Sequence, residues 1–390
     1  MNSIKKGERM EQIIIRDPIH GQISIFKEEK SIIDSKVFQR LRFIKQVGFS
    51  YLVYPGAMHT RFEHSLGTMF LADKFASALD LADSKRRELR IAALVHDIGH
   101  RAFSHDSETV IKKLLNLNHE KLGKKIILHS EIADFLNDAG YCPKKISSLA
   151  FGEGIGKLIS FDTGADRLDY LLRDAYYSGV AYGIIDWQRI LTCTKWAYSY
   201  PIIEYGGLEA AESVILARFM MFHTVYYHHT IKIARAMFQK ALELAIKNKE
   251  LGLKELEFGD MELLVYLKNT SAAFLINNIL DRKLYKRSLV VNWNALSKSQ
   301  KNYILTDLAK ELEDEFYLDA IIISPESFSS NLSLKIEDKN KKIIEIKKLS
   351  PLTNSLIKSA ANRSNLIVCA RNDLKHKVKN FVEKLLTKEK

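Results

Sequence analysis

Apolar residues recur every three or four positions along most of the first two-thirds of the chain, which predicts amphipathic helices. An extended segment over residues 12–23 comes first. A helix is then predicted over residues 32–47, with Gly48 as its stop signal. The same spacing predicts further helices over residues 61–82, 86–98, 107–117, 120–138 and 166–179, and a long helical run over 208–248.

Beyond about residue 250, short apolar runs alternate with polar turns. Residues 320–323 and 365–369 are predicted to be buried strands, and residues 334–337 with 343–346 a hairpin. Helical segments near 300–315 and 372–386 flank these strands. We therefore predict a mainly α protein, with a helical domain over residues 1–250 and a smaller α/β lobe over 251–390.

Composition narrows the class of protein. The chain has 390 residues, of which 46% are hydrophobic and only 6 are proline, so it can bury a large core and is not disordered. No apolar stretch approaches the ~20 residues that span a bilayer, and no apolar block follows the first residues. Three scattered cysteines do not suggest a disulfide framework. A cytoplasmic protein without a membrane partner is expected.

The net charge of +12 is compatible with nucleic acid, an anionic surface or small polyanions as ligands. Residues 1–240 carry 33 basic and 27 acidic side chains, and residues 241–390 carry 26 and 20, so each part contributes +6. The charge therefore marks no separate basic domain and does not by itself choose among these ligands.

Histidine is distributed unevenly, because seven of the twelve histidines lie between His59 and His129. His96 and Asp97 are adjacent at the end of an apolar helical stretch, just before Gly99. His64 and Asp166, on other predicted helices, would complete a set of two histidines and two aspartates. This mixed set suits a divalent metal ion such as Mn, Fe, Co, Zn or Mg, with positions left for water and substrate.

The order His, His-Asp, Asp resembles that of the HD-domain metal-dependent phosphohydrolases. The similarity extends over residues 11–235 and is greatest to the branch of deoxynucleoside triphosphate (dNTP) triphosphohydrolases. Six sequence blocks carry it in the right order: residues 17–21, 38–46, 54–57, 61–67, 96–105 and 166–179. The resemblance implies a helical HD domain whose metal is held by His64, His96, Asp97 and Asp166.

The resemblance also implies roles for residues around the metal. His119 matches the acid or base over the phosphates, and Glu108 the carboxylate that orients it. The substrate set comprises Arg61, His100 and His105 at the phosphates, Gln46 and Asp174 at the sugar hydroxyl, and Tyr170 beneath the sugar. Arg167 is added to this set because its basic side chain directly follows the proposed ligand Asp166 in the sequence.

The implied reaction is hydrolysis of a dNTP to deoxynucleoside and inorganic triphosphate. Asp34, Gln39 and Arg42 match positions that bind a guanine-nucleotide activator in regulated members, although the last two could simply pair with neighbours. An activator site of this kind lies between subunits, so the resemblance implies a homodimer or homotetramer.

Two departures leave other functions open. Gly164 replaces an aspartate that relatives usually carry, and Arg101 replaces a glycine at the edge of the phosphate pocket. One alternative is another phosphoester substrate, as in a nucleotide monophosphatase, a cyclic-nucleotide or oligonucleotide phosphodiesterase, or a nuclease. Another is a catalytically degenerate module that binds nucleotide or, as a lesser possibility, nucleic acid. A zinc protease, suggested by the His96 to His100 spacing, is disfavoured because Gly99 would disrupt the helix that such a motif needs.

Overall fold

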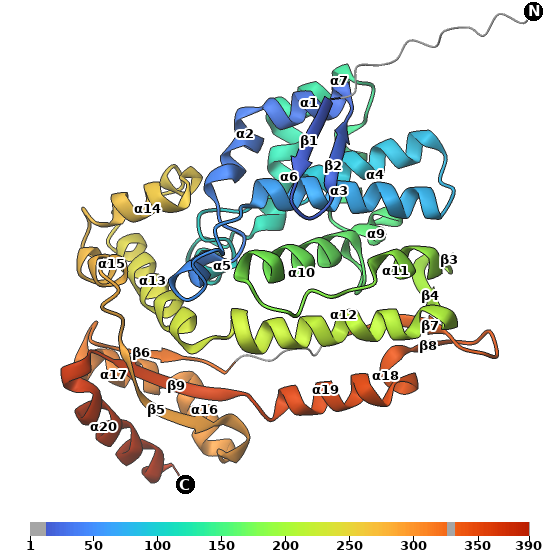
Figure 1. The fold of residues 1–390 in the computed structure, drawn as a ribbon. Coiled ribbons are helices and arrows are strands. Elements are labelled where there is room, and N and C mark those ends of the chain that lie inside the picture. Colours follow the sequence, from blue (N-terminus) through green and yellow to red (C-terminus); the bar gives the residue numbers. More distant parts are fainter. Residues whose placement is uncertain (1–12, 326–331, 390) are drawn as a thin grey trace, which may run out of the picture.

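A bundle of helices forms the body of the protein in the computed structural model, which describes residues 13–325 and 332–389 (Figure 1). The mainly helical class is confirmed. The central helices are α3 (Arg61–Ala78), α4 (Asp83–Val95), α5 (His105–Leu115), α6 (His119–His129), α7 (Glu131–Asp138), α8 (Pro143–Ala150), α9 (Lys157–Ser160) and α10 (Ala165–Ser178).

Helix α4 shows why these segments fold as predicted. Its last five residues, 91–95, are all apolar, and Leu89, Ile91, Leu94 and Val95 are completely buried. A helix that is apolar all round belongs in a protein interior. The His96-Asp97 pair follows directly and is also buried, so the packing of α4 fixes its position.

The predicted helix over residues 32–47 is wrong. The chain forms α1 (Lys27–Asp34), α2 (Lys36–Gln39) and a 3-10 turn (Arg40–Phe43) instead. Ser35 separates the first two: its Oγ donates to the carbonyl of Ile32 at 2.6 Å and accepts from the N–H of Phe38 at 3.2 Å. A serine that bonds the backbone on both sides ends one helix and starts the next.

Two other long helical predictions are also divided. Ser130 separates α6 from α7 by the same kind of backbone bonding. The predicted run over 208–248 becomes α12 (Leu208–Met221), a π-helical turn (Phe222–Tyr226) and α13 (His229–Lys247). Wider π turns of this kind often occur at functional sites.

The predicted strands and hairpin are confirmed, but they belong to two sheets. Strands β5 (Lys286–Asn292), β9 (Asn365–Ala370) and β6 (Ala320–Ile323) form an antiparallel sheet in that order. Figure 1 shows this sheet beside α16 (Lys298–Thr306), α17 (Leu308–Phe316) and α20 (Lys375–Lys388). Helices α14 (Asp260–Leu267) and α15 (Ala273–Leu280) lie along α13.

The hairpin of β7 (Lys335–Glu337) and β8 (Ile343–Glu345) instead extends a sheet begun by β3 (Thr194–Ala197) and β4 (Tyr200–Glu204). It joins the core of the helical body, together with the segment that follows it. The remaining elements are β1 (Ile13–Asp17), β2 (Gly21–Ile25), α11 (Trp187–Cys193), α18 (Ile346–Leu349) and α19 (Pro351–Ala361). Within the described ranges, no helix has the length and apolar character needed to cross a membrane.

Candidate metal and phosphate site

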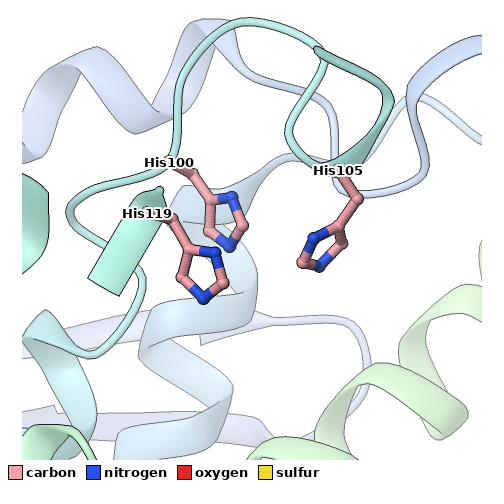
Figure 2. Close-up of side chains that lie close together, drawn as sticks. All are labelled: His100, His105 and His119. Carbon is pink, nitrogen blue, oxygen red and sulfur yellow. The ribbon is translucent and has the colours of Figure 1, made fainter. Parts of the chain in front are cut away.

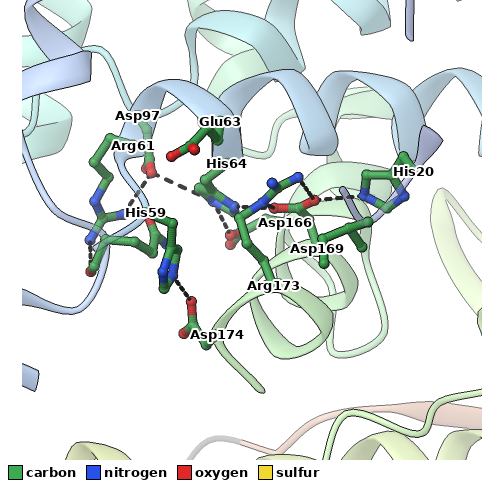
Figure 3. Close-up of polar contacts among 12 residues, drawn as sticks. His20, His59, Arg61, Glu63, His64, Asp97, Asp166, Asp169, Arg173 and Asp174 are labelled. Atoms are coloured by element: carbon green, nitrogen blue, oxygen red, sulfur yellow. Dashed lines mark hydrogen bonds and ion pairs between the residues drawn. The ribbon is translucent and has the colours of Figure 1, made fainter. Parts of the chain in front are cut away.

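The four predicted metal ligands come together from three helical segments. Figure 3 shows three of them, His64, Asp97 and Asp166. His64 lies on α3, His96 and Asp97 follow α4, and Asp166 is in the first turn of α10. The Nε2 atom of His64 lies 3.1 Å from Asp166 Oδ1 and 3.6 Å from Asp97 Oδ2. The Nε2 atom of His96 lies 3.8 Å from Asp166 Oδ1 and 3.4 Å from Asp97 Oδ1.

These donor atoms fit a divalent metal ion. Bonds of about 2.0–2.2 Å to one ion place neighbouring donors roughly 3.0–3.6 Å apart, which is close to the observed spacing. The Nε2 atoms of His64 and His96 are both buried without a hydrogen-bond partner. A buried polar atom without a partner is costly, and a metal bond would satisfy it. The Asp166 side chain is 36% exposed, so the site opens toward solvent on that side.

A buried network behind the ligands fixes the orientation of His64, and sequence analysis gave these residues no role. The Nδ1 of His64 donates to Asp169 Oδ2 at 2.8 Å, which leaves Nε2 as the metal-facing acceptor. Asp169 also binds His20 at 2.7 Å and Arg173, which in turn donates to Asp17 at 2.7 Å. The spacing of Asp166, Asp169 and Arg173 on one helix was the available signal.

Electrostatics favour a cation at this point. Burial lowers the pKa of His64, but Asp166 and Asp169 outweigh it and raise that pKa to about 10. Burial raises the pKa of Asp97, but His96, Arg61 and His100 outweigh it and hold that pKa well below its usual range. The carboxylates therefore stay ionised, as metal ligands must be.

Arg61, predicted to contact phosphate, is anchored within the protein. Its Nη1 donates to Asp97 Oδ2 at 2.6 Å, and its Nε to Ser104 Oγ at 2.9 Å. The side chain is buried. The structure thus places Arg61 where it neutralises the Asp97 carboxylate and ties it to the loop that carries His100 and His105.

A second group of three histidines lies next to the metal ligands (Figure 2). The Nδ1 of His119 donates to Glu108 Oε1 at 2.6 Å, and that of His105 to Oε2 at 3.1 Å. One carboxylate thus fixes the tautomer of both rings and leaves each Nε2 available. His100 joins this group to the metal ligands, since its Nε2 lies 3.3 Å from Asp97 Oδ1.

The geometry of this histidine group suits phosphate better than a second metal. The rings of His100 and His119 are stacked, with centroids 4.3 Å apart and planes 12° apart. Stacked rings point their in-plane lone pairs in parallel, whereas ligands of one ion must converge on it. Burial lowers the pKa of His100 well below normal. Burial also lowers the pKa of His119, but the Glu108 carboxylate outweighs burial and raises the pKa of His119 above its usual value. The pKa values of the two stacked rings are therefore shifted in opposite directions.

A small pocket lies against this group and is lined in part by Arg101, Asn118 and Leu122. Arg101 forms an ion pair with Glu257 at 3.5 Å, from a turn that precedes α14. Its cation thus lies at the pocket edge, as the sequence suggested, with a carboxylate from the C-terminal part of the chain as its partner.

Three of the predicted substrate residues, Arg167, Tyr170 and Asp174, belong to α10. Asp174 accepts from the Tyr226 hydroxyl at 2.5 Å and pairs with His59 Nε2 at 2.8 Å. The π-helical turn delivers Tyr226 to this position. Burial raises the pKa of Tyr170. Arg167 pairs with Asp162.

Gln46 offers a buried side-chain oxygen without a hydrogen-bond partner. Such an atom is available to a ligand that can donate a hydrogen bond. The predicted activator residues are engaged near the surface: Arg42 donates to Gln39 Oε1 at 2.8 Å and stacks over Phe62 at 3.5 Å, while Asp34 is exposed. Gln39 and Arg42 therefore pair with their neighbours, which is the alternative to activator binding that the sequence left open.

The backbone explains one departure from the family pattern. A Cβ atom at Gly164 would lie 2.5 Å from the carbonyl oxygen of Ile159, so an aspartate does not fit this position without a shift of the backbone. The protease alternative is wrong, because α4 ends at Val95 and the His96 to His100 segment is not helical.

Comparisons with known proteins agree with this geometry. A family model described as HD domain matches residues 61–167, and one described as HD associated region matches residues 185–390. An uncharacterised protein of Methanocaldococcus jannaschii is 38% identical, over 95% of this chain and 81% of that protein. The chain therefore belongs to the HD-domain phosphohydrolases that carry an HD-associated region, and its His/Asp cluster implies a divalent metal ion.

Two further similarities are informative. The crystal structure of a hypothetical protein from Aquifex aeolicus superimposes with a TM-score of 0.79 at 26% identity, over 95% of this chain and 99% of that one. A deoxynucleoside triphosphate triphosphohydrolase SAMHD1 homolog of Dictyostelium discoideum is 34% identical, over 50% of this chain and 42% of that protein. The first similarity covers the whole fold, whereas the second is partial.

Proposed function

We propose that this phosphohydrolase converts dNTPs to deoxynucleosides and inorganic triphosphate. The observation that carries the proposal is the junction of an open cluster of His64, His96 and Asp166, with Asp97 beside it, and a histidine group held by Glu108. Metal ligands and a proton-carrying imidazole side by side suit hydrolysis of a phosphoester. The partial similarity to a dNTP triphosphohydrolase supports the choice of substrate.

His64, His96, Asp97 and Asp166 would hold the metal, which when bound supplies Lewis-acid chemistry by activating water and neutralising phosphate charge. In the proposed reaction, the water oxygen bonds to the α-phosphorus and the bond from that phosphorus to the 5′-oxygen breaks. His119 would give the leaving oxygen its proton from Nε2, because Glu108 occupies Nδ1 and raises the pKa of the ring.

The other predicted site residues would bind the substrate. Neutral His100 and exposed His105 offer hydrogen bonds to phosphate oxygens, and Arg61 keeps Asp97 ionised beside them. Asp174 and the buried oxygen of Gln46 are acceptors suited to sugar hydroxyls. A guanine-nucleotide activator at Asp34, Gln39 and Arg42, and a homodimer or homotetramer, belong to the same proposal.

The test incubates the full chain with manganese and each of the four dNTPs, singly and mixed, and separates the products by ion-exchange chromatography. Deoxynucleoside with inorganic triphosphate is the expected result, abolished by a chelator. Monophosphate with pyrophosphate would contradict the proposal. Turnover of a cyclic nucleotide, a monophosphate or an oligonucleotide in place of dNTPs would assign the same site to another phosphoester.

A further inference from the structure

Asp260 is a buried carboxylate that lies outside the residues matched by the HD-domain model. It bonds the backbone of the loop that carries His100 and His105. It is the first residue of α14 and is completely buried. Its Oδ1 accepts from the backbone N–H of Phe103 at 2.7 Å, and its Oδ2 from that of Lys45 at 2.9 Å. Phe103 belongs to the segment from His100 to His105, here called the histidine loop, and Lys45 precedes Gln46.

The histidine loop has a backbone conformation that needs external support. Phe103 and Ser104 are consecutive residues with positive φ angles of 58° and 47°. Side chains with a Cβ rarely adopt this region, and such strain persists only where surrounding contacts enforce it. The Phe103 ring stacks on Phe49 with centroids 4.4 Å apart, and Asp260 holds its N–H. Side chain and backbone are thus anchored separately.

The approach of α14 to this loop depends on Gly259. A Cβ atom there would lie 2.6 Å from the Cβ of Phe43, so only glycine lets Asp260 enter the space between the two backbone segments. Burial raises the pKa of Asp260 to about 6, although the N–H groups of Phe103 and Lys45 oppose this rise. A buried carboxylate that is costly to ionise is commonly kept for a specific role.

We propose that Asp260 is a positioning residue of the active site. Through Phe103 it holds the histidine loop in the strained conformation that places His100 and His105 beside His119, and through Lys45 it fixes the backbone next to Gln46. The HD-associated region thereby supplies a part of the site that residues 61–167 do not contain. The expected loss of activity rests on the proposed function, whereas the expected change in amide hydrogen exchange does not.

The test compares Asp260→Asn and Asp260→Ala in the full chain. Asparagine keeps one acceptor oxygen and loses the other, whereas alanine loses both. We expect amide hydrogen exchange of residues 99–105 to accelerate in the order wild type, asparagine, alanine. Metal content should stay at the wild-type level, and kcat should fall about 10- to 100-fold in the same order, since small misplacements of catalytic groups have effects of this size.

Tyr285→Phe is the matched control. Its buried hydroxyl donates to the carbonyl of Leu318 at 2.6 Å, and Leu318 is not part of the histidine loop. The control should lower the thermal midpoint while kcat and loop exchange stay unchanged. Gly259→Ala provides a second route, because it displaces α14 without removing the carboxylate, and should loosen the loop as Asp260→Asn does.

Wild-type loop exchange in the Asp260 variants and in Gly259→Ala would overturn the proposal. So would an acceleration spread evenly over the whole chain, since that indicates general destabilisation. A wild-type protein that hydrolyses no dNTP or other phosphoester would instead contradict the proposed function, while the exchange experiment would still decide the role of Asp260.

Discussion

The two halves of the site are built differently. The metal half, His64, His96, Asp97 and Asp166, lies on or at the ends of packed helices and is backed by a buried network around Asp169. The phosphate half, His100, His105 and His119, lies on a strained loop and at a helix start, and the His105 side chain is 65% exposed. Rigid helices position the first half, whereas restraints from distant residues position the second.

This difference has a functional meaning. A metal site needs fixed distances, which helix packing provides. Groups that meet a substrate must admit it from solvent, so they lie on loops that a scaffold supports. Changes in the metal half should therefore affect metal and activity together, and changes in the phosphate half should affect activity alone.

The largest expected effect is that of Asp97→Ala. Asp97 is a proposed metal ligand, and it also pairs with Arg61 and His100. Its removal should abolish both bound metal and turnover. Metal analysis of the purified variant measures the bound metal, and a dNTP assay measures turnover. Retained turnover without Asp97 would refute the proposed metal half.

His119→Ala should separate the halves. The variant should keep wild-type metal content, because His119 contacts no metal ligand directly, while kcat falls about 10²- to 10⁴-fold as expected for loss of a general acid. Metal analysis and steady-state kinetics on the same preparation provide the comparison. Loss of metal together with activity would mean that the two halves are one unit.

Asp169→Asn tests the network behind His64. The amide can no longer accept from His64, His20 and Arg173 together, so the His64 ring loses its fixed orientation. Metal affinity should fall about 10- to 100-fold. Titration of the apo-protein with manganese measures this change. Excess metal should restore much of the turnover, and failure to do so would place the role of Asp169 elsewhere.

The smallest expected effect is a shift in the pH profile of Glu108→Gln. Burial lowers the pKa of His119, but Glu108 outweighs it and raises that pKa above its usual value. The imidazolium and the stability from this pair are therefore fully present below about pH 6.5 and are lost as pH rises through the raised pKa. Without the carboxylate, the alkaline limb of kcat should move to lower pH. An unmoved limb would remove His119 as the proton donor.

The sequence predicted the metal half better than the rest. Apolar periodicity located α3, α4 and α10, and the His-Asp pair at the end of one helix pointed to the ligands. Ser35 and Ser130 divided predicted helices, because side-chain bonds to the backbone compete locally with helical periodicity. Asp260 was beyond prediction, since nothing in the local pattern around it indicates a contact with Phe103, 157 positions away.

The most direct test of the proposed reaction is hydrolysis of one dNTP with manganese in water enriched in oxygen-18, followed by mass spectrometry of the products. We expect inorganic triphosphate that carries the label and deoxynucleoside that does not, because water attacks the α-phosphorus. Release of pyrophosphate or orthophosphate, or label in the deoxynucleoside, would contradict it.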